Sequence, residues 1–544
     1  KQGLCMQKFS FKSHLAVTAS AALLAGLLAT PVYAQDSGNG ADNQDEIITT
    51  GTRRKARSAA DTPAPVDVIS GMEMTNQASN DVQDLLRTAV PSYNVNAQPI
   101  SDAATIIRPA NLRGLSPDNT LVLLNGKRRH RAAVISFLGG GIADGSQGVD
   151  VSAIPSMALK QVEVLRDGAS SQYGSDAIAG VINFVLKDSD TGGSIEAKYG
   201  STYDGDGDNY RLGANYGFAL GDKGFFNVTA EYGETDGTVR AAPRGDVEGL
   251  IAAGNTDVAD FLTVNSYTDE YAQYWGQPDV EGDLKLLFNT ALEVSDNLEV
   301  YAVGTYAERT TTGGFFYRNP TNRGGVYAGP SVDAAGNLGG DISSILVGDL
   351  DGLGVGEACP AGIPLTGTDG LIPDATVLAQ VTASENCFSF VETIPGGFVP
   401  RFGGDLVDYS ISGGVRGTID LGTGLSYDLS ATHGSSEVEF FIENTVNASL
   451  GPNTPRDFVP GAYEQTETIF NADFAYNFPM EGWASDLTFA FGAEYREEKF
   501  DVTAGDANSF ALGPLATPTA AFPSGQGFST SSNGFGGFSR STSN

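Results

Sequence analysis

From about residue 193 onward, apolar and polar residues alternate along the chain with a period of two. In the segment 210–218, one face carries apolar residues, namely Tyr210, Leu212, Ala214, Tyr216 and Phe218. The other face carries Arg211, Gly213, Asn215 and Gly217. Because successive side chains of a strand point to opposite faces, this alternation predicts β-strands with one apolar and one polar face.

Repeats of this pattern predict nine strands, at roughly residues 194–203, 209–219, 224–235, 283–294, 297–309, 406–419, 424–434, 466–478 and 486–499. The connections alternate between short turns and the long loops 236–282, 310–405 and 435–465. Short turns on one side and long loops on the other are typical of an outer-membrane β-barrel whose apolar face contacts lipid. A soluble β-sandwich has no reason to keep that alternation.

Residues 60–190 follow a different pattern, which predicts a compact α+β domain. Apolar residues recur at helical spacing in residues 81–87, and Asn80 is a favourable N-cap. A strand at residues 121–124 ends at Asn125-Gly126, which is a strong hairpin-turn signal. The remaining elements are a strand, a short helix and a second strand, at residues 161–166, 169–179 and 180–187.

The N-terminus reads as a secretory signal peptide. Lysines precede an apolar run at residues 15–29, and the sequence Val32-Tyr33-Ala34 resembles a cleavage site. We therefore expect residues 1–34 to be removed, with Met6 as the start of translation. No later segment has 18 consecutive apolar residues, so no transmembrane helix is expected.

A short β-favouring segment lies between polar and basic sequence, at residues 45–54 (DEIITTGTRR). It has no neighbouring strand in the local sequence with which it could pair. We predict that it pairs with nothing in its own chain and that its extended backbone adds as a strand to the sheet edge of a partner protein.

Charge and motifs exclude several classes of function. The chain has 32 Lys+Arg and 66 Asp+Glu residues, a formal charge of −34, which argues against nucleic acid as a partner. Residues 204–208 (DGDGD) resemble a calcium loop but lack its later Gly and Glu. We found no phosphate-binding loop, metal-protease motif or nucleophile motif, so we expect no enzyme activity, no metal site and no cofactor. In an exported protein, Cys359 and Cys387 are expected to form a disulfide.

Three segments give the chain a resemblance to TonB-dependent outer-membrane receptors. Residues 45–54 look like the TonB box, residues 111–127 (NLRGL to LVLLNGK) look like the central plug motif, and residues 154–187 look like the closing signature of the plug. The resemblance implies an α+β plug domain followed by an antiparallel transmembrane β-barrel, which has 22 strands in the family. It also implies binding to TonB and its inner-membrane energising complex through Asp45, Glu46, Ile47, Ile48, Thr49, Thr50 and Gly51.

By the same resemblance, the plug apex contacts the ligand. The residues in those places are Arg113, Lys127, Arg128, Arg129, His130 and Arg131. So many cations in an acidic protein favour an anionic ligand. The alternative is that they pair with acidic residues of the barrel wall, because buried charges need partners. Ferric siderophores and oligosaccharides remain open. The loop aromatic residues, among them Tyr274, Trp275, Phe315, Phe316 and Tyr317, suit either ligand stacking or loop packing.

The expected domains are the signal peptide (1–34), a periplasmic segment with the TonB box (35–59), the plug (60–190) and the first part of the barrel (191–544). Nine strands and the polar ending GFGGFSRSTSN predict a C-terminally truncated receptor. The expected function is TonB-dependent uptake of a scarce nutrient across the outer membrane of a Gram-negative bacterium, with the N-terminus in the periplasm. The alternatives are a passive porin-like channel and a non-functional receptor fragment.

Overall fold

The computed structural model describes residues 47–48, 50, 57–58, 65–77, 79, 81–95, 103–136, 141–264, 272–329, 344–354, 359–367, 369–482 and 486–544. The predicted signal peptide lies outside these residues. No helix in the described part of the chain is long and apolar enough to cross a membrane.

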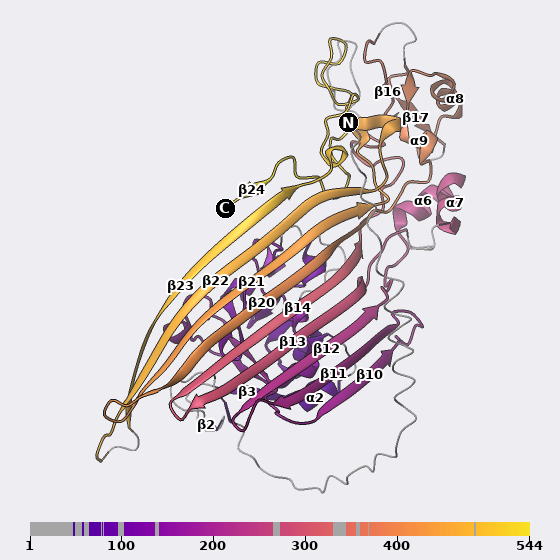
Figure 1. Cartoon of the computed structure of the whole chain (residues 1–544). Coiled ribbons are helices and arrows are strands. Elements are labelled where there is room, and N and C mark those ends of the chain that lie inside the picture. Colours follow the sequence, from indigo (N-terminus) through magenta and orange to yellow (C-terminus); the bar gives the residue numbers. More distant parts are fainter. Residues whose placement is uncertain are drawn as a thin grey trace, which may run out of the picture. The chain divides into compact units, whose positions relative to one another are not determined.

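Nine long antiparallel strands form one sheet in which neighbours in sequence are neighbours in space (Figure 1). They are β10 (Gly193–Gly200), β11 (Asn209–Ala219), β12 (Gly224–Thr235), β13 (Asp279–Ser295), β14 (Leu298–Gly314), β20 (Arg401–Ile419), β21 (Leu425–Glu443), β22 (Phe458–Phe478) and β23 (Leu487–Ala504). The two-residue strand β24 (Thr542–Ser543) pairs with the end of β23. The nine strands lie where the alternating pattern predicts strands.

The two faces of this sheet differ as the alternation predicts. On β11, the rings of Tyr216 and Phe218 are each 49% exposed. Arg211 and Asn215, on the opposite face of the same strand, are 4% and 6% exposed. The sheet therefore turns apolar side chains outward and polar side chains toward the rest of the protein.

Strands β21 and β22 are longer than expected, so the connection between them is 444–457 rather than 435–465. Residues 437–442 continue the alternation, with Val438, Phe440 and Ile442 fully buried on one face. On the opposite face, glutamates occupy two of the three positions, Glu437 and Glu439. A glutamate-rich stretch resembles a loop in the sequence, whereas register with the neighbouring strands keeps it extended.

The first domain is built on a five-stranded sheet in the order β3-β8-β9-β6-β7. Its strands are β3 (Val66–Ser70), β8 (Leu159–Leu165), β9 (Gly180–Leu186), β6 (Thr120–Leu124) and β7 (Lys127–Arg128). The smaller elements are α2 (Gly71–Thr75), α3 (Val82–Ala89), α4 (Ala104–Ile107), α5 (Ser170–Tyr173), β4 (Tyr93–Val95) and β5 (Ala110–Leu112). Leu85, Val162 and Phe184 are fully buried in the core of this domain.

The N-cap of α3 is Asp81 and not the predicted Asn80. The carboxylate of Asp81 accepts a hydrogen bond from the amide of Gln83 at 2.7 Å. Both residue types cap helices well, so the sequence alone could not choose between adjacent positions. The choice follows from packing, because Asp81 also accepts a hydrogen bond from Ser152 Oγ of the same domain.

The loops that follow β12 and β14 carry structure of their own. The first contains α6 (Gly245–Ala252) and α7 (Thr256–Val264). The second contains β15 (Ser344–Ile345), β16 (Gly348–Asp349), β17 (Ile363–Thr366), β18 (Ile372–Pro373), α8 (Ala375–Ala383), β19 (Cys387–Phe388) and α9 (Phe390–Thr393). A disulfide joins Cys359 to Cys387. An apolar cluster in this second loop contains Val326, Tyr327 and Cys387. Leu515 and Phe528, which follow β23, pack into the same cluster.

Candidate functional site

A tight hairpin positions the cationic run at residues 127–131. Asn125 and Gly126 both have positive φ, at 48° and 77°, as a two-residue turn of this kind requires. The amide of Gly126 donates to Asn183 Oδ1 at 2.9 Å, which holds the turn against β9. Residues 127–131 therefore leave the plug sheet from a fixed point.

Asp408 on β20 binds two of these residues. The Arg129 guanidinium pairs with one carboxylate oxygen of Asp408, and His130 Nε2 lies 2.9 Å from the other. Arg129 is 4% exposed, His130 is 2% exposed and Asp408 is 1% exposed. A buried charge is costly unless it is paired, so Asp408 secures the plug to the sheet. A second buried ion pair also joins the plug to the sheet. Here the cation, Arg309, lies on the sheet strand β14, and the anion, Asp150, lies in the plug at 2.8 Å.

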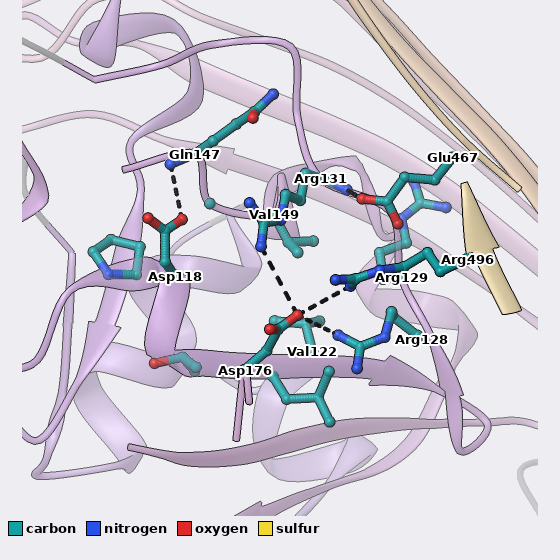
Figure 2. A pocket seen from close by; sticks show the side chains of 14 residues that line it. Asp118, Val122, Arg128, Arg129, Arg131, Gln147, Val149, Asp176, Glu467 and Arg496 are labelled. Atoms are coloured by element: carbon teal, nitrogen blue, oxygen red, sulfur yellow. Dashed lines mark hydrogen bonds and ion pairs between the residues drawn. The ribbon is translucent and has the colours of Figure 1, made fainter. Parts of the chain in front are cut away.

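Asp176 receives three arginines from two domains (Figure 2). Its Oδ2 lies 2.5 Å from Arg128, 3.2 Å from Arg496 of β23 and 3.9 Å from Arg131. The amide of Arg131 also donates to Glu467 Oε1 at 3.1 Å. The cavity among these side chains measures about 20 Å³. That volume holds about one water molecule, so the arginines are already packed against their partners.

The two remaining predicted ligand residues lie apart from this cavity. Lys127 Nζ is 3.0 Å from Asp428 of β21. The Arg113 side chain is 43% exposed, its Nη1 is 3.8 Å from Asp167, and it donates to the carbonyl of Ala179 at 3.4 Å. Arg113 is therefore the most accessible of the predicted cations.

A larger cleft of about 560 Å³ opens between the plug and the strands β22 and β23. Lys127, Arg128 and Tyr173 line it from the plug, and Asp473 and Glu494 line it from the sheet. Charges of both signs thus face this space. A small polar molecule can fit there beside the plug.

The sequence showed the cations but not their partners. Asp408, Asp428, Glu467 and Arg496 were not singled out, although each is a charged residue within an alternating strand. The position of Asp408 could have been recognised from the sequence, because Leu406, Asp408 and Ser410 share one face of β20. A carboxylate on the buried face of a strand requires a cation as its partner. Which cation it binds depends on the tertiary structure.

The segment proposed as the TonB box does pair within its own chain, which corrects our prediction. Strand β1 (Ile47–Ile48) is antiparallel to β2 (Arg57–Ser58). Thr50 is buried, and its amide donates to Glu163 Oε2 at 2.9 Å. Glu163 is fully buried and also accepts hydrogen bonds from Gln161 Nε2 and Asn183 Nδ2, at 2.8 Å and 3.3 Å.

The physical reason is that a buried carboxylate needs donors, and Thr50 supplies an amide and a hydroxyl. Local sequence could not show this, because Glu163 lies 113 residues away. The other predicted box residues Asp45, Glu46, Thr49 and Gly51 lie outside the described residues.

No group of three or more potential metal ligands occurs within the described ranges. The described site consists of paired charges between the plug and the sheet. Its chemistry is that of binding and of holding one domain against another.

The structure therefore consists of a small α+β domain held against one face of a long antiparallel sheet by buried ion pairs. The family model "TonB-dependent Receptor Plug Domain" matches residues 58–181. The ferric enterobactin receptor of Pseudomonas aeruginosa is 30% identical over 165 residues, which is 30% of this chain and 21% of that protein. The vitamin B12 transporter BtuB of Vibrio cholerae is 30% identical over 219 residues, which is 40% of this chain and 31% of that protein. Residues 58–181 therefore match the plug domain of TonB-dependent receptors.

Each alignment thus covers less than a third of the curated relative's own length. Among solved structures, the siderophore receptor PirA from Acinetobacter baumannii is similar at 16% identity with a TM-score of 0.45, over 83% of this chain and 49% of that chain. The ferric enterobactin receptor PfeA of P. aeruginosa is similar at 15% identity with a TM-score of 0.47, over 88% and 54%.

Proposed function

We propose that the protein takes part in the TonB-dependent active uptake of a scarce nutrient across the outer membrane. The observation that carries the proposal is the plug domain seated against the polar face of the sheet through buried ion pairs such as Arg129–Asp408. The opposite face of the sheet exposes apolar side chains such as Phe218. A lipid environment suits that face, and a polar lumen suits the other. No catalytic step is part of this function.

Transport requires that the plug be pulled. Residues 45–51 are the proposed handle, and an extended strand can add to the sheet edge of TonB through backbone hydrogen bonds. In the structure, β1 already pairs with β2, and Thr50 is bound to Glu163. Binding of TonB would therefore compete with these contacts, with the N-terminus on the periplasmic side.

The nutrient is proposed to be a ferric siderophore, an oligosaccharide or a similar molecule. Relatives named as receptors for ferric enterobactin and vitamin B12 support a small organic ligand. The proposed contacts are Arg113 and residues 127–131. Since Lys127, Arg128 and Arg129 each pair with a carboxylate, an anionic ligand would have to compete with Asp428, Asp176 and Asp408.

The handle can be tested without knowing the ligand. Thr49→Pro removes one backbone donor from the segment, whereas Thr49→Ser keeps it. We expect the affinity of the purified C-terminal domain of TonB for the full chain to fall about fivefold in the proline variant, because one net hydrogen bond is worth about 1 kcal/mol. The serine variant should bind within about twofold of the parent. Titration calorimetry in detergent measures both.

Equal affinity of the proline and serine variants would contradict the proposed handle. The rival function, a passive channel, makes a different prediction. A channel would conduct ions across a planar bilayer without TonB and regardless of the substitution at residue 49. The receptor proposal expects low conductance, because the plug lies against the sheet.

A further inference from the structure

The loops after β12 and β14 form a cleft of about 420 Å³ that is separate from the plug. The residues that line it include Arg244, Asp246, Phe316, Arg318, Asn322 and Arg323. A volume of this size is within the range of small-molecule sites, which is about 300–1,000 Å³.

The lining is positively charged although the protein is strongly acidic. It holds three arginines and one aspartate, a net charge of +2, whereas the whole chain carries −34. Arg244 forms a bidentate ion pair with that aspartate, since its Nε and Nη2 lie 2.8 Å and 3.1 Å from the two oxygens of Asp246. Asn319 Nδ2 also donates to Asp246 at 3.0 Å. Neither of these contacts to Asp246 involves Arg323.

Arg323 has no carboxylate partner among the described residues. Its Nη2 donates to the neutral side chain of Asn533 at 3.0 Å, and its Nε is buried without a hydrogen-bond partner in the described part of the chain. Burial lowers the pKa of the guanidinium, as expected for a cation that lacks a compensating anion. An anion in the cleft would supply the missing charge.

Arg318 adds a second positive charge beside Arg323. It is 4% exposed, and its guanidinium carbon lies 5.6 Å from the centre of the Phe315 ring. Its backbone pairs with that of Phe398, so the residue is held in place within the loop between β14 and β20, which we call the loop unit. The two arginines thus come from one short segment, which fixes their spacing.

Phe316 gives the cleft an aromatic wall. Its neighbours Phe315 and Tyr317 are 7% and 4% exposed, whereas Phe316 is 46% exposed. A large aromatic side chain left in water between two buried ones is available to stack on a planar ligand. The cleft thus combines the exposed ring of Phe316 with the guanidinium of Arg323, which has a neutral partner. These two groups are complementary to a ligand that has an aromatic ring with acidic substituents.

We propose that this loop cleft binds a planar organic anion, of the aryl carboxylate class, through Arg323 and the ring of Phe316. Arg323 would hold a carboxylate with two parallel N–H···O bonds, and Arg318 would supply a second positive charge. The proposal names a ligand site of the receptor and so rests on the proposed function for its biological meaning. The binding itself requires neither transport nor TonB.

The test uses the full chain in detergent and benzene-1,3,5-tricarboxylate as the probe, with the neutral 1,3,5-benzenetrimethanol as the matched compound. Saturation-transfer NMR should detect the tricarboxylate and give at least tenfold weaker binding for the neutral compound. Arg323→Gln should weaken binding of the tricarboxylate tenfold or more, because charge-assisted hydrogen bonds are lost. Phe316→Ala should weaken it about threefold to tenfold.

Arg540→Gln is the control, since Arg540 is exposed and does not line the cleft. It should bind the probe like the parent chain. Equal binding of the charged and neutral compounds, or unchanged binding in both the Arg323 and Phe316 variants, would overturn the proposal. Affinity for the TonB domain should be the same in all these variants. A failure of the cleft is thereby distinguished from a failure of the handle.

Discussion

Two groups of arginines in this protein, one in the plug and one in the loop that follows β14, differ in their surroundings. Arg128 and Arg129 in the plug are each paired with a carboxylate, and one of those carboxylates comes from the sheet. Arg323 in the loop unit donates to a neutral amide. The difference shows that a cationic run does not by itself mark a ligand site. What matters is whether the fold has already supplied the anion.

The plug cations therefore act first as connectors between domains. The apolar core of the plug would form without them, whereas its position against β20 and β23 depends on Asp408 and Asp176. Arg323 instead joins two loop segments, because its partner Asn533 follows β23. Removing an anion from the first group should therefore destabilise the protein, whereas loosening the second should affect the loops and leave the plug unchanged.

The largest effect is expected from Asp408→Asn. The substitution leaves the Arg129 guanidinium buried without its anion, which typically costs about 3–5 kcal/mol. The free energy of unfolding, measured with urea in detergent, should fall by that amount. Asp405→Asn on the same strand is the matched control, because Asp405 is exposed. A loss equal to that of the control would mean that Arg129 finds another partner.

The next effect is expected in the loop unit. Replacing both Cys359 and Cys387 by serine removes a link between positions 28 residues apart, which is worth about 3–4 kcal/mol of local stability on chain-entropy grounds. Hydrogen exchange should then speed up in residues 387–399 and stay unchanged in the plug strands β8 and β9. Binding of the tricarboxylate should also weaken in the double serine variant. Val326 and Tyr327, which follow Arg323, pack in the same apolar cluster as Cys387. Faster exchange in the plug would contradict this separation.

A smaller effect is expected from Asp176→Asn, about 1–2 kcal/mol, because this carboxylate is partly exposed. Burial acts to raise the pKa of Asp176, but Arg128 and Arg496 outweigh it and hold the pKa below its ordinary value of 3.8. Its stabilising contribution is therefore complete above pH 3.8 and is lost as the pH falls through the lower pKa of the folded state. Unfolding measured between pH 6 and pH 3 should show that loss in the parent and not in the variant.

The matched control for that measurement is Asp167→Asn. Asp167 lies 3.8 Å from Arg113 with a side chain that is 63% exposed, so this pair should contribute little. A similar loss in both variants would show that Asp176 is no more important than a surface carboxylate.

Sequence reasoning located most elements because their signals are local. Period-two alternation placed the nine long strands, and Asn125-Gly126 placed the hairpin that carries the cationic run. Strand ends were less accurate, as in β21, where glutamates continue the strand beyond residue 434. The alternation of apolar and polar residues predicts that a strand is present, but backbone pairing with neighbouring strands determines the residue at which it ends.

The candidate sites divide in the same way. The amino-acid sequence shows which residues carry charge and which segment favours an extended conformation. The tertiary structure alone decided that Asp408 balances Arg129, that Glu163 holds Thr50, and that Arg323 is left with a neutral partner. Each of these depends on groups that are 113 to 279 residues apart in the chain. Electrostatic balance is set by distance in space, and local sequence carries no information about that distance.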